Sequence, residues 1–176
     1  KIAARYFEAI RDRIREVAPN KLYLGARFGL PAYPDLSRRE DWLMPLAAQS
    51  CDVVSFNRYR YTIRELRLAD GIDRPIIIGE FHFGALDRGL LHTGLVSSYD
   101  QRERAALYEF YVREALRNPL IVGTHWFELN DEPTTGRRDG ENYQIGFLDI
   151  CDNPYPEIIG ASRSLGRQLY KIRAGR

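Results

Sequence analysis

The chain has 176 residues, 44% of them hydrophobic, and this length and composition are typical of a single domain with a buried core. Its 26 lysines and arginines nearly balance its 24 aspartates and glutamates, and the net charge of +2 gives no sign of nucleic-acid or membrane-surface binding. Cys51 and Cys151 lack the paired spacing of a zinc site or a disulfide framework. We expect a neutral partner, no nucleic acid and no membrane.

Helical and strand-like patterns alternate along the chain. Apolar residues recur every three or four positions over 2–17, which predicts an amphipathic helix that Pro19 and Asn20 end. Short apolar runs bounded by turn residues predict strands at 22–28, 52–57, 74–81 and 120–126. Helices are predicted between and after these strands, at 39–49, 62–69, 99–117 and 156–172.

Strands that are apolar on both faces and alternate with helices predict an α/β fold with a parallel sheet covered by helices. Two architectures fit this pattern. An open doubly wound sheet suits the length, whereas a complete (β/α)8 barrel usually needs roughly 250 residues, so the chain would supply four of its eight units. No Gly-rich phosphate loop follows any predicted strand, which argues against a nucleotide-binding domain. Both architectures place their sites at the C-terminal ends of the strands.

Glu80 is the first candidate for a catalytic residue. It ends an otherwise apolar strand, where a carboxylate needs a partner or a function. Alternation along the strand predicts that Glu80 shares one face with Ile76 and Ile78. His82 would follow on the same face. A Glu that merely pairs with an arginine or caps the next helix is an equally good interpretation from position alone.

Other polar and aromatic residues also follow predicted strands. The indole of Trp126 would offer a flat apolar face for the C–H face of a sugar ring, although a tryptophan can equally belong to the core. Asn57 and Tyr59 are two positions apart and could hydrogen-bond a hydroxyl-rich ligand or the Glu80 carboxylate, while Tyr59 could also close the core. Arg27 would need a carboxylate partner if it is buried, and a surface position is equally plausible.

The three histidines, His82, His92 and His125, raise the question of a metal site. No two of them have the i, i+4 spacing of a zincin helix, and parity places His125 on the face opposite Trp126. The chain also has no Gly-x-Ser-x-Gly nucleophile elbow. We therefore expect neither a metal nor an acyl-transfer serine.

Four segments together resemble the β-agarases of glycoside hydrolase family fifty, in clan A. The segments are 78–89 (IGEFHFGALDRG), 92–94 (HTG), 123–127 (GTHWF) and 136–147 (GRRDGENYQIGF). The FHFGA and DGENYQ runs are the most specific of these motifs, and the likeness extends from about Leu22 to the last helix. The resemblance implies that residues 1–176 are strands five to eight of a catalytic (β/α)8 barrel, with the N-terminal half absent from this chain.

The resemblance also implies a retaining mechanism in which Glu80 is the nucleophile. Such enzymes need a second carboxylate about 5–5.5 Å away as acid/base. In the family this residue is a Glu preceded by Asn on the fourth strand, and this chain contains no Asn-Glu pair. We expect the acid/base to lie upstream of Lys1 and the fragment alone to be inactive.

The implied activity is cleavage of β-1,4 galactosidic links in a neutral, agarose-type galactan, without a metal or organic cofactor. The implied partners are this galactan and the missing N-terminal half of the barrel, and secretion or a periplasmic location is implied by the resemblance alone. Another clan-A β-glycosidase such as a β-galactosidase, or a non-catalytic carbohydrate-binding half-barrel, remains an alternative. The candidate substrate-binding residues are Arg27, Asn57, Tyr59, His82, His92, Trp126, Glu128 and Asn142.

Overall fold

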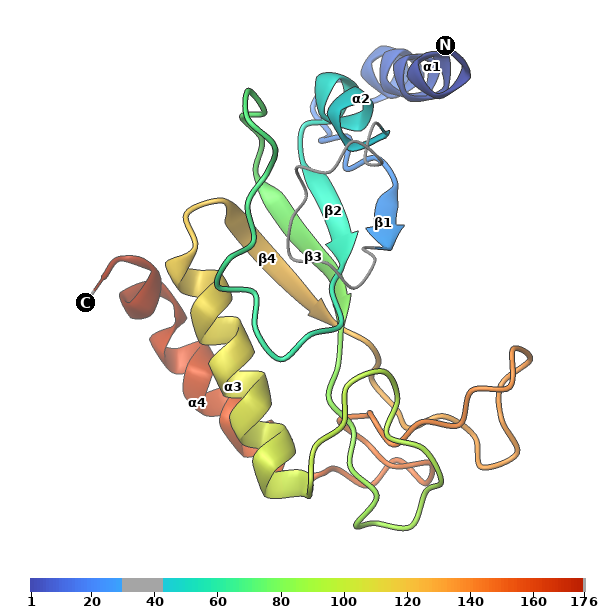
Figure 1. Ribbon diagram of the computed structural model, residues 1–176, viewed down its shortest axis with the longest axis vertical. Helices are drawn as coiled ribbons and strands as arrows, with labels where there is room; N and C mark the ends of the chain where they lie inside the picture. Colours follow the sequence, from blue (N-terminus) through green and yellow to red (C-terminus); the bar gives the residue numbers. More distant parts are fainter. Residues whose placement is uncertain (30–42, 176) are drawn as a thin grey trace.

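The computed structural model describes residues 1–29 and 43–175, which form an α/β fold (Figure 1). Its helices and strands, in chain order, are α1 (Ile2–Val17), β1 (Arg27–Gly29), α2 (Leu43–Ser50), β2 (Val54–Asn57), β3 (Ile76–Phe81), α3 (Gln101–Arg117), β4 (Ile121–Trp126) and α4 (Pro156–Arg173). Within these ranges, none of the helices combines the length and apolar character needed to cross a membrane.

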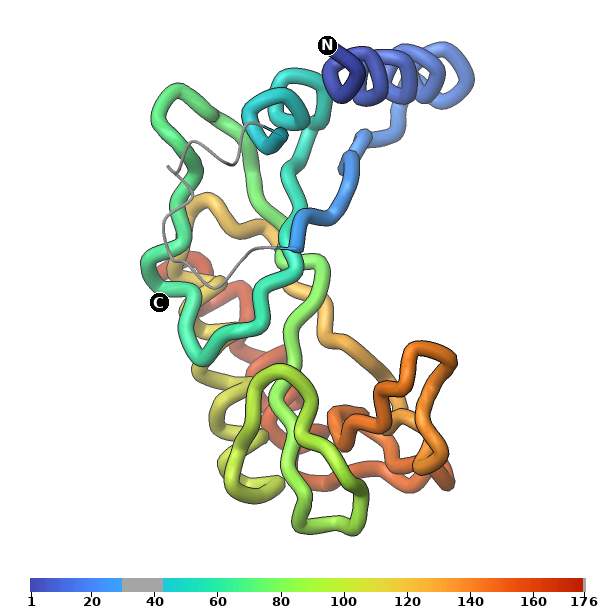
Figure 2. The backbone as a smooth tube through the Cα atoms, turned by 45° about the vertical axis from the view of Figure 1, so that its right-hand side comes forward, coloured from blue at the N-terminus to red at the C-terminus, as the bar shows by residue number. Residues whose placement is uncertain are grey.

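The four strands form one parallel sheet in the order β1-β2-β3-β4, as predicted. Because all four run in the same direction, their C-terminal ends meet at one edge (Figure 1). The long loops after β3 and β4 extend beyond this edge and lie together, as the second view also shows (Figure 2). A parallel bridge between His92 and Tyr143 joins the two loops.

The main core lies between the sheet and helices α2, α3 and α4. Phe56, Ile76 and Ile78 of the sheet are fully buried there, together with Tyr111 of α3 and Leu165 of α4. Burial of an apolar side chain of this size stabilises a fold by about 1.5–3 kcal/mol. This face of the sheet therefore supplies much of the stability and leaves the opposite face free for polar residues.

The first strand is shorter than predicted. Residues 22–26 are irregular, and β1 begins only at Arg27. Gly25 adopts a φ of +65°, and a Cβ there would lie 2.4 Å from Sγ of Cys51. The apolar run thus contains a backbone conformation that a strand cannot continue through, and only glycine adopts it readily.

The helix predicted at 62–69 does not form, because α3 binds the backbone and side chains of this segment. The carboxylate of Glu114 accepts hydrogen bonds from the Thr62 hydroxyl (2.5 Å) and the Ile63 amide (3.1 Å). Nδ2 of Asn118 donates to the carbonyl of Leu66 (3.0 Å). The other predicted helices are present, although residues 39–42 of the second lie outside the described residues.

A buried arginine on α3 holds the two long loops at the strand ends. Arg104 donates from Nε to the carbonyl of Phe83 (2.9 Å) and from Nη2 to the carbonyl of Gly146. Its guanidinium also lies over the ring of Tyr155, 5.2 Å from the centroid. Burial lowers the pKa of Arg104 to about 10, so the side chain stays charged at neutral pH. One cation therefore binds the backbone of both long loops.

Candidate active site

The end of β3 contains an irregularity that decides where Glu80 points. The pairing of β3 with β4 shifts between Ile78 and Phe81, and the pairing with β2 shifts where Asn57 meets Glu80. Ile76, Ile78 and Phe81 all belong to the helix-covered core, whereas the Glu80 carboxylate contacts Arg27, whose side chain lies across the other face of the sheet at Gly79. The prediction that Glu80 shares a face with Ile76 and Ile78 is therefore wrong, because simple alternation does not continue across a bulge.

Two donors from neighbouring strands hold the Glu80 carboxylate. The Tyr59 hydroxyl, just beyond β2, donates to Oε2 at 2.7 Å, and Nη1 of Arg27 on β1 lies 3.0 Å from Oε1. Burial, followed by the hydrogen bond to Glu80, raises the pKa of Tyr59, so the phenol remains a donor at neutral pH. The Glu80 side chain keeps 16% of its surface exposed. The carboxylate is thus fixed in direction and still accessible.

Arg27 reaches Glu80 by lying across a glycine. Its Cδ lies 2.3 Å from the position that a Cβ on Gly79 would occupy, and the hydroxyl of Ser55 lies 2.9 Å from the same position. Nη1 of Arg27 also donates to the Gly79 carbonyl (3.1 Å). Any larger residue at 79 would displace the arginine or the serine. Arg27 therefore has a surface position, with 53% of its side chain exposed, and it is nevertheless paired with a carboxylate.

Asn57 is paired with Glu80 in the sheet register, so its amide lies on the neighbouring strand at the same level. Its Oδ1 is buried and has no hydrogen-bond partner in the structure. A buried amide oxygen without a donor is costly. The structure thus leaves this acceptor unsatisfied beside Glu80, and the contact of Asn57 with a hydroxyl group of a ligand stays a prediction.

His82 is buried, and it contacts the site through the ring of Tyr59. It is 1% exposed; Nδ1 lies 3.1 Å from the Phe127 carbonyl, and Nε2 accepts from the Leu95 amide at 2.8 Å. The second bond places the proton on Nδ1, and burial lowers the pKa of His82 to about 4. Its ring lies 4.6 Å from the ring of Tyr59. The expected contact of His82 with sugar hydroxyls does not fit this geometry, because the backbone occupies both ring nitrogens.

The two long loops bring further predicted residues to the same end of the sheet. The ring of Tyr143 lies 5.9 Å from His82 and 5.0 Å from His92, and the Gln144 amide donates to the His92 carbonyl (2.8 Å). Asn142, partly exposed, precedes Tyr143 in the chain. His92 and Asn142 therefore belong to the loop wall beside His82, although no contact connects either of them to Glu80 in the described residues.

Arg137 forms ion pairs with several carboxylates of the loop after β4, and it was not predicted from the sequence as a site residue. Its guanidinium forms ion pairs with Glu132 (3.3 Å), Asp139 (2.6 Å) and Glu141 (2.8 Å). The hydrogen bond that Arg137 donates to Asp139 is the largest of the effects that raise the pKa of Arg137. The predicted ligand Glu128 lies 3.7 Å from the same guanidinium and is 39% exposed.

Of the two aromatic residues Trp126 and Phe127 at the end of β4, Phe127 is the one that lies near His82. The Phe127 ring lies 6.2 Å from that of His82 and carries the Arg137 guanidinium at 5.4 Å. The Trp126 indole instead packs against Phe81 in the core and donates from Nε1 to the Ile145 carbonyl (2.8 Å). The stacking surface expected of Trp126 is therefore not at this cluster. If the alternation of β4 is continued beyond Trp126, Phe127 points to the opposite face, and this pattern in the sequence could have identified Phe127 as the residue near His82.

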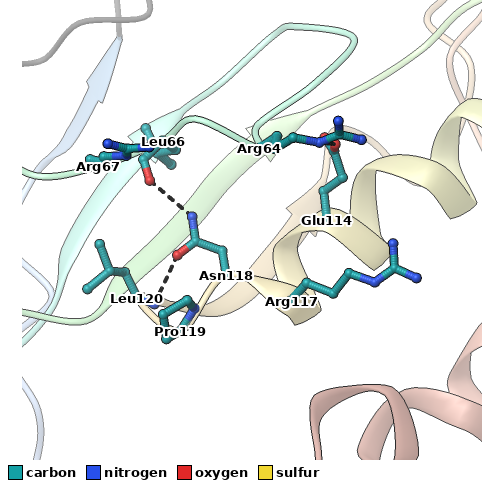
Figure 3. Close-up of a pocket in the computed structure, with 8 residues that line it drawn as sticks. All are labelled: Arg64, Leu66, Arg67, Glu114, Arg117, Asn118, Pro119 and Leu120. Carbon is teal, nitrogen blue, oxygen red and sulfur yellow. Dashed lines mark hydrogen bonds and ion pairs between the residues drawn. The ribbon is translucent and has the colours of Figure 1, made fainter. Parts of the chain in front are cut away.

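A pocket of about 340 Å³ lies away from Glu80, between the C-terminal end of α3 and the start of β4 (Figure 3). Its polar groups largely satisfy one another. Nε of Arg64 lies 2.9 Å from Glu114, and the Asn118 side chain bonds both to Leu66 and to Leu120. Among the residues that the structure describes, three or more His, Cys, Asp or Glu side chains do not gather as a metal would require.

Comparisons with known proteins point to one enzyme family, although no family model matches the chain. β-Agarase B of Vibrio sp. (strain JT0107) is 40% identical over 98% of the chain, and β-agarase A of the same strain is 37% identical over 97%. The chain spans only 18% and 17% of the lengths of these two relatives.

Solved structures agree with the sequence comparison. An exo-β-agarase superposes on 98% of the chain with a TM-score of 0.87 and 38% identity, and the chain covers 23% of it. A second agarase gives a TM-score of 0.86 at 40% identity over 97% of the chain and 26% of its own length. A β-glucuronidase of Faecalibacterium prausnitzii, 14% identical with a TM-score of 0.64 over 94% of this chain and 28% of its own, shares the fold alone. The chain is thus a relative of one segment of the family-fifty β-agarases.

Proposed function

We propose that this chain is the part of a β-agarase that carries the catalytic nucleophile, Glu80. The observation that supports this most directly is the carboxylate held by Tyr59 and Arg27 at the C-terminal edge of a parallel sheet, where α/β proteins bind their substrates. The agarase relatives over nearly the whole chain supply the substrate class, a galactan.

The proposed reaction is hydrolysis with retention. An oxygen of Glu80 attacks the anomeric carbon, the bond to the leaving sugar oxygen breaks, and an acid transfers a proton to that oxygen. Water then attacks the same carbon, gives up a proton to the conjugate base and releases the Glu80 carboxylate. Tyr59 and Arg27 orient the attacking carboxylate before the bond forms. No metal or organic cofactor is needed for these steps.

The proton donor would come from a part of the protein outside this chain. In the proposal, β1 to β4 are strands five to eight of a barrel, and the opposite strands carry a second carboxylate about 5–5.5 Å from Glu80. The sheet face with Arg27, Ser55 and Gly79 would then line the barrel interior. The N-terminal half of the barrel is therefore a proposed partner of this segment, and the galactan is the proposed substrate.

The test uses the full-length protein and agarose. Replacement Glu80→Gln should reduce kcat by at least about 10³-fold, because the substitution removes the nucleophile. Glu8→Gln is the matched control, since Glu8 is exposed on α1. An activated 2-deoxy-2-fluoro-galactoside should label the peptide that contains Glu80, as mass spectrometry would detect.

Azide provides a second readout. In Glu80→Ala, azide should restore cleavage of an activated β-galactoside and yield the α-galactosyl azide, because azide attacks from the face that the carboxylate has vacated. A parent-like rate of Glu80→Gln on agarose, or labelling of a different peptide, would show that Glu80 is not the nucleophile. Activity confined to small β-galactosides would instead identify a β-galactosidase.

A further inference from the structure

A second pocket, of about 560 Å³, lies between residues 58–66 and helix α3. It lies beside the segment that also brings Tyr59 to Glu80. The side chains that matter for its chemistry are Arg58, Arg60, Tyr61, Arg64, Leu107 and Phe110. We call it the arginine pocket.

Arg60 contributes its guanidinium group to the arginine pocket, and within the described residues no hydrogen bond or ion pair of this group is seen. Its Nη2 is buried without an acceptor. Arg64, by comparison, is paired with Glu114 at 2.9 Å. A cationic nitrogen that is removed from water and lacks an acceptor is unfavourable unless a ligand supplies one. The buried Nη2 of Arg60 would therefore be satisfied by a ligand with an anionic or strongly accepting group.

The charge around Arg60 favours an anion over a neutral acceptor. Arg58 also lines the pocket, and burial followed by the charge of Arg60 lowers the pKa of Arg58. The two guanidinium groups thus repel one another, and an anion between them would relieve the repulsion. Glu65 lines the pocket as well, but it is exposed, so solvent weakens its effect on a bound anion.

The remaining walls suit the apolar face of a sugar ring. Tyr61 and Phe110 present aromatic surface, and Leu107 of α3 adds aliphatic surface. Tyr61 is held in place, because its hydroxyl donates to the Ser97 carbonyl (2.8 Å) and its ring stacks on Phe83 with centroids 6.2 Å apart. Aromatic faces are the usual contacts for the C–H face of a sugar.

We propose that the arginine pocket binds an anionic sugar unit, one that carries a sulfate ester or a carboxylate. Arg60 donates to the anionic group, and the aromatic walls contact the ring. The identification of the anion's carrier as a sugar rests on the proposed function, whereas the anion site itself rests on the arginines. The site is separate from Glu80 and needs no turnover to be detected.

Calorimetric titration of the full-length protein with galactose 6-sulfate, galacturonate, galactose and inorganic sulfate tests this proposal. Both charged sugars should bind, whereas any binding of galactose, which lacks the anionic group, should be the same in the parent protein and in Arg60→Gln. Arg60→Gln should weaken binding of the charged sugars at least about tenfold, which corresponds to ~1.4 kcal/mol. Arg163→Gln is the matched control, because Arg163 is an exposed residue of α4. Hydrolysis of agarose is measured on the same variants and should be unchanged, which separates this site from the function of Glu80.

Several outcomes overturn the proposal. The first is that neither charged sugar binds. The second is that Arg60→Gln and Arg163→Gln lose the same binding affinity. The third is that inorganic sulfate binds as tightly as galactose 6-sulfate, which would indicate a plain anion site.

If Arg60→Gln does not fold, Arg60→Lys replaces it. Lys keeps the charge and loses the planar fork, so binding should be weakened less and should still fall as salt increases. Binding by the parent protein that does not respond to salt contradicts the proposal.

Discussion

The hydroxyl of Tyr59 donates to the Glu80 carboxylate at 2.7 Å and thereby joins the end of β2 to the end of β3. The same tyrosine ring packs 4.6 Å from the buried ring of His82. Because His82 is bonded to the backbone of both long loops, the position of the carboxylate is coupled to the loops that surround it. The site is thus built from contacts between elements and not from any single motif.

Removal of the Tyr59 hydroxyl should reduce activity without unfolding the protein. A hydrogen bond to a charged group contributes about 1.5–3 kcal/mol, so Tyr59→Phe should lower kcat/KM on agarose by about tenfold or more. The ring keeps its packing on His82, and the thermal unfolding temperature should change little. Tyr99→Phe, at an exposed tyrosine, is the control. Unchanged kcat/KM in Tyr59→Phe would show that the hydroxyl does not assist Glu80.

A methyl group at Gly79 should disturb Glu80 through Arg27. The new Cβ would lie 2.3 Å from Cδ of Arg27, so the arginine must move away from the carboxylate. We expect Gly79→Ala to reduce kcat/KM on agarose about tenfold or more, comparable to Arg27→Ala. Gly123→Ala on β4 is the matched control, because its Cβ would meet Ile77 at an ordinary distance of 3.7 Å. Similar activities of the two alanine variants would contradict the prediction.

His82 should make stability depend on pH. Its pKa is lowered to about 4 by burial from an ordinary value of 6.5, so between these values the unfolded chain binds the proton more readily than the folded one. The free energy of unfolding should therefore be highest above pH 6.5 and fall as the pH drops toward 4. The full difference between the two pKa values corresponds to about 3 kcal/mol.

Urea unfolding of the full-length protein at a series of pH values measures this effect. His82→Gln should be less stable near neutral pH, since it loses the buried ring, but should lose less additional stability on acidification. His125→Gln, at an exposed histidine, should keep the slope of the parent protein. Parallel curves for the parent and His82→Gln would mean that His82 does not cause the dependence.

Much of the fold could be predicted from local patterns. The periodicity over 2–17 and the cap at Asp100, whose side chain accepts from the Glu103 amide (2.8 Å), each depend on a few neighbouring residues. The segment at 62–69 also has local helical character, but Glu114 of α3 and Asn118, directly after α3, bind it in a non-helical form. Long-range hydrogen bonds override a weak local preference, and no window of the sequence contains them.

The sequence by itself determined that the chain is α/β, that its strands are parallel, and that Glu80 stands at a strand end, because hydrophobic spacing and turn residues are local properties. The expected burial of the first strand is wrong, since two of the three residues of β1 are exposed. Only the tertiary structure decided which way Glu80 points, that Tyr59 and Arg27 hold it, and that Phe127 lies beside His82 while Trp126 enters the core. The reason is physical: the irregularity between Ile78 and Phe81 changes which face the last residues of β3 occupy, and pairing with neighbouring strands sets that irregularity.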